Sequence, residues 1–162
     1  MAPVRTELET LRRTARLWFL GSAIVPLAAL AWAALTPAEW WYRFDEFRVH
    51  DAVEGDPVMV TVRRTVGKGG PGVASVQVYK FGSANKPEMA CASPNIPINY
   101  RADASLPPPE DQTLRWWMFS APCSGRLSPG RYLAQTTIRF DPPGYFDKIA
   151  FAEATFTILP RP

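Results

Sequence analysis

The stretch "VMVTVRRTV" (residues 58–66) decides the fold class of this 162-residue chain. Valines recur at every second position, at Val58, Val60 and Val62, whereas the polar Thr61 faces the other way. Successive side chains of a β-strand point to opposite faces of the sheet, so a period of two predicts a strand with one buried face.

A second stretch of the same kind follows closely. "VASVQVYKF" (73–81) sends Val76 and Val78 to one face, and "GKGGPG" (67–72) lies between the two stretches. Glycine and proline at this density predict the tip of a β-hairpin. A phosphate-binding loop would need Ser or Thr after Lys68 and a helix behind it, and the sequence offers neither.

Four more segments alternate in the same way, at 43–49, 114–119, 131–140 and 149–159. Each is bounded by turn-forming residues, and no segment of useful length between them has a helical period. About six strands of this kind predict an all-β domain, most simply a β-sandwich.

The turn "LSPGRY" (127–132) resembles the L-x-P-G-x-Y turn that leads into a late strand of many bacterial immunoglobulin-like domains. The resemblance implies a tyrosine corner, in which Gly130 forms the turn and Tyr132 hydrogen-bonds back across it. Immunoglobulin domains carry a cysteine two residues after that tyrosine, where this chain has Ala134. The resemblance therefore implies an immunoglobulin-like β-sandwich without the usual inter-sheet disulfide.

The N-terminal part has a different pattern, because residues 17–35 contain no charged side chain. As a helix this run is about 28 Å long, close to the thickness of the bilayer core. Trp18 and Trp32 stand near its ends, where aromatic rings favour the lipid headgroups, and a mid-helix proline such as Pro26 is tolerated in membranes. The run predicts one transmembrane helix.

The flanking charges predict its orientation. Residues 1–16 hold four arginines and two glutamates, as the positive-inside rule expects of a cytoplasmic tail. We therefore expect a signal anchor at 17–35, retained in the inner membrane of a bacterium, and a periplasmic domain at 36–162. The alternative is cleavage at the A-x-A-like sites 29–31 or 31–33, although both lie inside the apolar run.

The basic character of the chain does not predict a nucleic-acid partner. Its sequence pI is about 9.1 and its formal net charge is +3. Residues 1–35 supply two of these three net charges, so the outer domain is nearly balanced. A polyanion-binding surface needs a basic excess that this domain lacks.

The two cysteines, Cys91 and Cys123, both fall in the outer domain. In an oxidising compartment an even pair is more often a disulfide than a metal site or a nucleophile. We expect them to be bridged.

Residues 82–113 are rich in proline and have little period. A segment of this length without regular structure is uncommon in a compact domain and is usually functional or poorly ordered. The sequence predicts a long proline-rich loop.

A catalytic or metal-binding set is not recognisable. His50 is the single histidine, and no G-x-S-x-G or S-x-x-K motif is present. The acidic residues within 45–56 lack the spacing of an EF-hand, which leaves a solvated strand edge as the simplest interpretation of them. We expect no catalytic, cofactor-binding or metal-binding residues and no enzymatic activity.

Aromatic residues are the one surplus that suggests binding. On a strand at 114–119, Leu114, Trp116 and Met118 would share one face, and Trp117 and Phe119 the other. If the first face is core, Trp117 and Phe119 form an exposed strip for a partner. The alternative is that both faces are covered.

The sequence thus predicts a membrane-anchored binding or structural module that contacts another envelope or phage component. One N-terminal helix before a small β domain is similar to uncharacterised envelope proteins, some of them carried by phages and prophages. The alternative function is an envelope enzyme or enzyme subunit that uses the acidic residues in 45–56 or the loop at 82–113.

Overall fold

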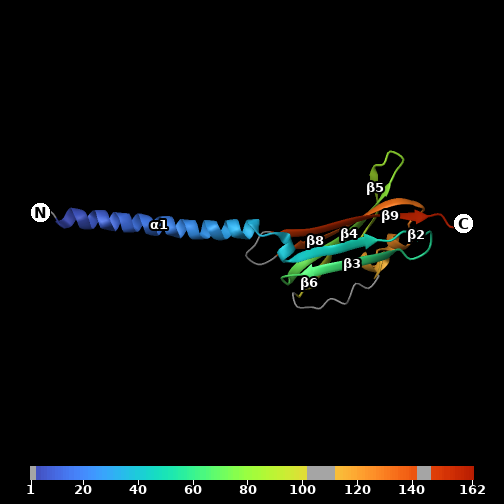
Figure 1. The fold of residues 1–162 in the computed structure, drawn as a ribbon, viewed down its shortest axis with the longest axis horizontal. Helices are drawn as coiled ribbons and strands as arrows, with labels where there is room; N and C mark the ends of the chain where they lie inside the picture. The colour runs from blue at the N-terminus through green and yellow to red at the C-terminus, as the bar shows by residue number, and fades with distance from the viewer. Residues whose placement is uncertain (1–2, 102–111, 142–146) are drawn as a thin grey trace. The chain divides into compact units, whose positions relative to one another are not determined.

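A computed structural model describes residues 3–101, 112–141 and 147–162 of the chain. They divide into an N-terminal helix with the residue that follows it, and a β domain that begins at Pro37. The helix α1 (Pro3–Leu35) and the strands are drawn in Figure 1. The expected fold class, an all-β domain with one helix at the N-terminus, is confirmed at this level.

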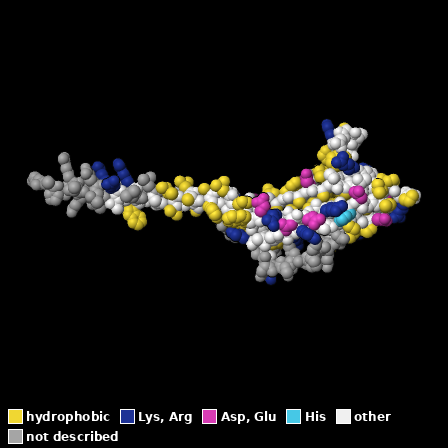
Figure 2. All heavy atoms as spheres, in the orientation of Figure 1, with side chains coloured by type: hydrophobic (Ala, Val, Ile, Leu, Met, Phe, Trp, Pro, Cys, Tyr) yellow, Lys and Arg dark blue, Asp and Glu magenta, His cyan; other side chains and the backbone are white. Residues whose placement is uncertain are grey.

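Helix α1 has no polar face in its second half. Its segment Arg12–Leu35 is long and apolar enough to cross a membrane, and at 1.5 Å per residue it measures about 36 Å. Large apolar side chains along it are more than half exposed, among them Trp18, Phe19, Leu27 and Trp32. Figure 2 shows these hydrophobic side chains along the helix. A helix that is apolar all round is typical of a membrane span or signal segment.

The β domain contains two sheets. The first has three antiparallel strands in the order β1 (Tyr42–Val49), β3 (Met59–Val66) and β7 (Gln112–Thr113). The second has the order β2 (Ala52–Val53), β9 (Lys148–Leu159), β8 (Gly130–Phe140), β4 (Gly70–Phe81) and β5 (Pro87–Ala92), and β6 (Ile96–Tyr100) also pairs with β4. The described part of the domain also has three short helices: η1 (Ala38–Trp40) precedes β1, and α2 (Leu114–Trp117) and η2 (Pro122–Gly125) lie between β7 and β8.

The two sheets share a hydrophobic core. Val60 from the first sheet and Val78 and Ala134 from the second are completely buried and belong to one cluster. The period of two explains the arrangement, because alternate residues of each strand face this cluster. Five of the six predicted strands therefore form where the sequence placed them, as β1, β3, β4, β8 and β9.

The predicted strand at 114–119 is wrong, because this segment begins with the helical turn α2. The hydroxyl of Thr113 accepts a hydrogen bond from the backbone N–H of Trp116 at 3.2 Å, as an N-cap does. The backbone N–H of Met118 then donates to the carbonyl of Leu114 at 2.8 Å. A capped turn of helix thus replaces the extended backbone on which the alternation depended.

The predicted hairpin at 67–72 is also wrong, since β3 and β4 lie in different sheets and do not pair. The chain crosses from one sheet to the other there, and the backbone N–H of Gly67 donates to the carbonyl of Trp41 at 3.0 Å. A Cβ atom at Gly67 would lie 2.3 Å from the carbonyl oxygen of Trp40. Glycine is required here by this close approach and not by a hairpin turn.

The segment 82–113 is more regular than its proline content predicts. It contains β5, β6 and β7, and β5 and β6 pair with successive parts of the same edge of β4. Residues 102–111, which include the three consecutive prolines, lie outside the described residues.

Candidate ligand site between the sheets

Helix α2 determines which aromatic side chains reach the surface. Its residues at spacing i, i+3 and i+4, Leu114, Trp117 and Met118, share one face and are at most 8% exposed. Trp116 lies on the opposite face and is 57% exposed. The predicted environments of the two tryptophans are therefore wrong, because alternation on a strand assigns Trp116 to the core and Trp117 to the surface. Phe119 is exposed, as predicted, at 38%.

The turn after α2 is held in an unusual backbone conformation. Phe119 and Ser120 both have positive φ, 53° and 59°, in the left-handed region. For residues other than glycine this costs about 1–2 kcal/mol each. The backbone N–H of Ser120 offsets part of the cost by donating to the carbonyl of Arg115 at 2.7 Å. Strained backbone is commonly found at functional sites.

The disulfide ties this segment to the second sheet. Cys123 of η2 is bonded to Cys91 of β5, and their Cα atoms are 5.5 Å apart, inside the usual range. The structure thus contains the expected disulfide. Its position, four residues after Phe119, fixes the C-terminal side of the strained turn.

A hollow of about 160 Å³ lies beside α2. Side chains from α2, β3, β4, β6 and β8 line it, so it is enclosed by both sheets. Four of the lining residues are aromatic, namely Tyr100, Trp116, Trp117 and Phe119. Arg64 is the only charged lining residue among those that the structure describes, and we therefore call this space the Arg64 hollow.

Arg64 is a half-buried cation among aromatic rings. Its Cζ atom lies 5.2 Å from the ring centre of Tyr100 and 6.0 Å from that of Trp117. One guanidinium nitrogen is 3.3 Å from the Tyr100 hydroxyl and 3.4 Å from the Tyr42 hydroxyl, both long for hydrogen bonds. In the part of the chain that the structure describes, Arg64 makes no ion pair with a carboxylate.

Its neighbour Arg63 has the opposite environment. The side chain of Arg63 is 63% exposed and forms an ion pair with Glu46 at 3.5 Å. The sequence already contained this difference, because the alternation of Val58, Val60 and Val62 continues to position 64 on the inner face. Arg64 is thus a site residue that the prediction from sequence does not include, although the alternation contains the signal for it.

The tyrosines beside Arg64 remain neutral phenols. Burial is the main cause that raises the pKa of Tyr42 and that of Tyr100, and it outweighs the opposite effect of the nearby guanidinium. A buried phenol resists ionisation because the charged form loses its hydration. The described lining of the hollow consequently carries the single positive charge of Arg64.

Trp117 adds a second unused donor. Its indole nitrogen Nε1 is buried, and it has no hydrogen-bond partner among the residues that the structure describes. An unpaired buried donor costs about 1–3 kcal/mol. Arg64 and Trp117 thus both carry N–H donors that the described residues do not fully pair.

The residues predicted to form a tyrosine corner lie outside the Arg64 hollow. The hydroxyl of Tyr132 donates to the carbonyl of Ser128 at 2.6 Å, and its ring stacks on Phe156 with centres 5.3 Å apart. Gly130 has a φ of +148°, a conformation that side chains disfavour. Both residues stabilise a turn and do not line the Arg64 hollow.

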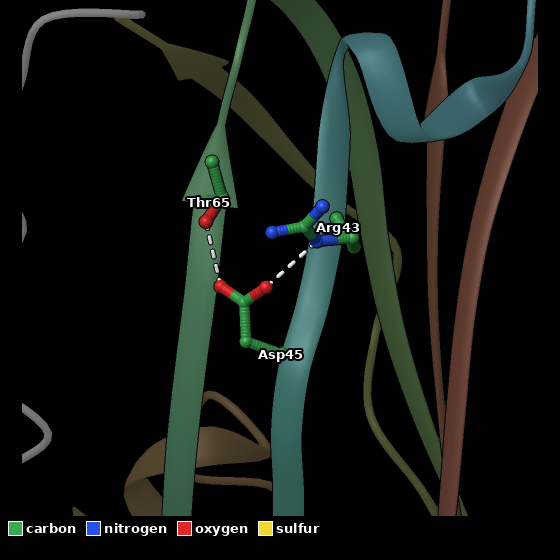
Figure 3. A network of polar contacts seen from close by, with 3 residues as sticks. All are labelled: Arg43, Asp45 and Thr65. Carbon is green, nitrogen blue, oxygen red and sulfur yellow. Dashed lines mark hydrogen bonds and ion pairs between the residues drawn. The ribbon is translucent and has the colours of Figure 1, made fainter.

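The acidic residues in 45–56 are dispersed among separate partners. Asp45 accepts hydrogen bonds from Thr65 at 2.6 Å and Arg43 at 2.7 Å (Figure 3), which together lower its pKa. Further along the chain, Asp51 accepts from the backbone N–H of Thr157 at 2.6 Å. Within the described ranges no group of three or more His, Cys, Asp or Glu side chains could hold a metal ion.

Asp56 and His50 of the same region also have surface partners. Asp56 pairs with Arg161 at 2.6 Å, and the His50 ring lies 2.8 Å from the Thr61 hydroxyl. These contacts hold the ends of strands and loops in place. They do not bring the acidic side chains together around a substrate.

No family model matches the chain, and no curated protein matches it. A solved structure similar to this chain is CopC from Methylosinus trichosporium OB3b, with 19% sequence identity and a TM-score of 0.37. The match covers 75% of this chain and 96% of that one. At this level of similarity, nothing about function can be carried over to this chain.

Proposed function

We propose that this protein is a membrane-anchored binding module, with its β domain on the outer side of the inner membrane of a bacterium. The observation that carries the binding function is the aromatic rim of the Arg64 hollow, formed by Trp116 and Phe119. Exposed aromatic side chains next to a concave site are typical of partner-binding surfaces. The strained turn that presents Phe119 supports the same interpretation.

Two observations support the location. Helix α1 exposes large apolar side chains in its C-terminal half and carries its arginines in its N-terminal half, as expected of an anchor with a cytoplasmic N-terminus. The disulfide between Cys91 and Cys123 is a feature of oxidising compartments such as the periplasm. We place the β domain there and its partner among other envelope or phage components.

We further propose that the domain is an immunoglobulin-like β-sandwich. The shared core between two sheets and the hydrogen bond from Tyr132 to Ser128 support this assignment. Such folds serve many unrelated functions, so the proposed binding function rests on the aromatic rim and not on the fold.

Fusions of a reporter enzyme that is active only in the periplasm test the topology. A reporter after Pro162 is expected to be active, and one before Met1 inactive. An inactive C-terminal fusion would contradict the location. Recovery of the mature chain in the soluble fraction, beginning inside or just after α1, would instead assign α1 as a cleaved signal.

Site-specific crosslinking tests the rim. A photoreactive amino acid at position 116 is expected to crosslink the full chain to one distinct protein in intact cells. The control is position 151 on β9, where Phe151 is 52% exposed and outside the hollow. Equal products from both positions, or none from 116, would contradict a partner at the rim.

The enzyme alternative would use the acidic residues in 45–56 or the segment 82–113, and the first of these can be examined in the structure. Since Asp45, Asp51 and Asp56 each have a different partner, no observation favours a shared catalytic role for them. Replacing the three aspartates together by asparagine is expected to leave the crosslink from position 116 intact.

A further inference from the structure

We propose that the Arg64 hollow binds a carboxylate carried on a compact apolar body, with the Arg64 guanidinium as its counter-ion. This inference goes beyond the proposed partner contact, because it concerns the interior of the hollow and not its rim. It holds whether or not a protein docks on Trp116 and Phe119.

Arg64 has no countercharge among the described side chains. A guanidinium has five N–H donors, and the described contacts of Arg64 use one nitrogen, at 3.3–3.4 Å, toward two phenols. Since burial keeps Tyr42 and Tyr100 neutral, neither of them supplies a negative charge. A half-buried cation is stabilised by an anion that arrives with the ligand.

The neighbouring Arg63 on the same strand differs in this respect. Arg63 faces solvent and has a carboxylate partner in Glu46. Arg64 points toward the core, where water screens charge least, and has none among the described side chains. A charge in the less polar environment gains more from a counter-ion than one on the surface.

Arg64 also has unused donors in an aromatic setting. Its Cζ atom lies 6.0 Å from the ring centre of Trp117, which lines the same hollow. A carboxylate has two acceptor oxygens and can accept from two N–H groups of one guanidinium, so it suits a side chain with several donors.

The volume and the lining of the Arg64 hollow determine what the rest of the ligand can be. A dry cavity of about 150 Å³ accommodates a benzene ring, and the Arg64 hollow measures about 160 Å³. Its remaining walls are aromatic or largely aliphatic, with Ile98 and Val76 among them. A phosphate dianion would leave uncompensated charge against these walls, whereas a monocarboxylate balances Arg64 one to one.

Matched ligand pairs test the charge requirement. Phenylacetate and phenylacetamide have nearly the same shape and differ in charge. We would titrate both into the full chain in lipid nanodiscs and follow binding by calorimetry and by tryptophan fluorescence, which reports on Trp116 and Trp117. Phenylacetate is expected to bind about tenfold more tightly or better, and less tightly as salt rises.

Matched variants assign the effect to Arg64. Arg64→Met keeps the length of the side chain and removes its charge, and it is expected to weaken phenylacetate binding at least about tenfold while sparing that of phenylacetamide. Arg63→Met removes the neighbouring charge on the outer face and is expected to bind phenylacetate as the wild type does. If Arg64→Met does not fold, Arg64→Lys is used instead, because it keeps the charge and removes the planar fork of N–H donors. Its loss of affinity for phenylacetate is expected to be intermediate.

Two sources could supply such a carboxylate, a free acid or the C-terminus of a partner chain. A tripeptide ending in Phe, as the free acid and as the C-terminal amide, distinguishes them. Tighter binding of phenylacetate assigns the site to a free acid, and tighter binding of the peptide acid assigns it to a chain terminus.

The proposal is overturned if wild-type protein binds phenylacetate and phenylacetamide equally, or if neither ligand binds. It is also overturned if Arg63→Met and Arg64→Met lose the same affinity, because the effect would then be general electrostatics. Crosslinking from position 116 is scored separately, so failure of this proposal and failure of the partner rim are distinguishable.

Discussion

The core between the two sheets has halves of different chemistry. The half around Val58, Val60, Val78, Cys91 and Ala134, all at most 6% exposed, is mainly aliphatic, although the stacked rings of Tyr132 and Phe156 belong to the same cluster. We call it the aliphatic half. The aromatic half contains Tyr42, Arg64, Tyr100 and Phe140, with the ring of Tyr42 5.1 Å from that of Tyr100 and 5.8 Å from that of Phe140. The Arg64 hollow lies beside the aromatic half. The disulfide between Cys91 and Cys123 lies at the aliphatic half.

This difference indicates that the aliphatic half of the core serves mainly stability, whereas the aromatic half is suited to binding. Interiors filled with valine and alanine pack densely and leave little space. Aromatic rings around a cation instead leave a hollow and a charge without its counter-ion, an arrangement that a core built only for stability would not need. Trp117 lies at the boundary, since it belongs to the main core cluster and also lines the hollow.

The largest expected effect comes from removing the Trp117 side chain at this boundary. Trp117→Ala is expected to lower the free energy of unfolding by about 3–5 kcal/mol, because it leaves a large cavity between the halves. Trp116→Ala is the control, with an expected loss below about 1 kcal/mol, since the ring is 57% exposed. Denaturant unfolding of the two variants measures both values. If both variants lost the same free energy of unfolding, Trp117 would not be the residue that packs between the two halves.

The second prediction concerns the aliphatic half alone. Replacing Cys91 and Cys123 together by serine opens a loop with a sequence separation of 32 and is expected to cost about 3–4 kcal/mol. Mass spectrometry without reductant should first show the two cysteines joined in the exported protein. Two free thiols there would contradict the disulfide and with it the expected loss.

The third prediction is smaller and tests the tyrosine corner. Tyr132→Phe removes the hydrogen bond to the carbonyl of Ser128 and keeps the ring stacked on Phe156. It is expected to cost about 1 kcal/mol. Tyr79→Phe, which removes a side-chain bond to Gln77 on the outer face of the second sheet, is the control with a lower expected cost. A thermal melt of each variant compares them.

The strands of both halves could be predicted because a period of two is a local property of the sequence. Val58, Val60 and Val62 specify the buried face of β3 without knowledge of any partner strand. Strand pairing, in contrast, is not a local property of the sequence. The glycines at 67–72 suggest a hairpin, and only the assembled fold shows that β3 and β4 belong to different sheets.

The candidate site was predicted less well, for a different reason. Trp116 and Trp117 exchange their environments because one capped turn of helix replaces a strand, and Thr113 as its N-cap was the available signal. Arg64 was overlooked because an arginine is normally read as an outward residue, although its position required it to point inward. The hollow itself depends on contacts among α2, β3, β6 and β8, which no local pattern contains.

The smallest expected effect concerns the outer surface of β1, at the bulge between Phe44 and Glu46. The hydroxyl of Thr65 and the guanidinium of Arg43 lower the pKa of Asp45, so its carboxylate stabilises the fold above its ordinary pKa of about 3.9. Asp45→Asn is expected to cost a few tenths of a kcal/mol at pH 7, as exposed ion pairs do. This difference from the wild type should vanish as the pH falls through the lowered pKa, where both chains are neutral at this position. Denaturant unfolding between pH 7 and pH 2 measures it, and a difference that persists at pH 2 would mean that Asp45 acts through the geometry of the bulge and not through its charge.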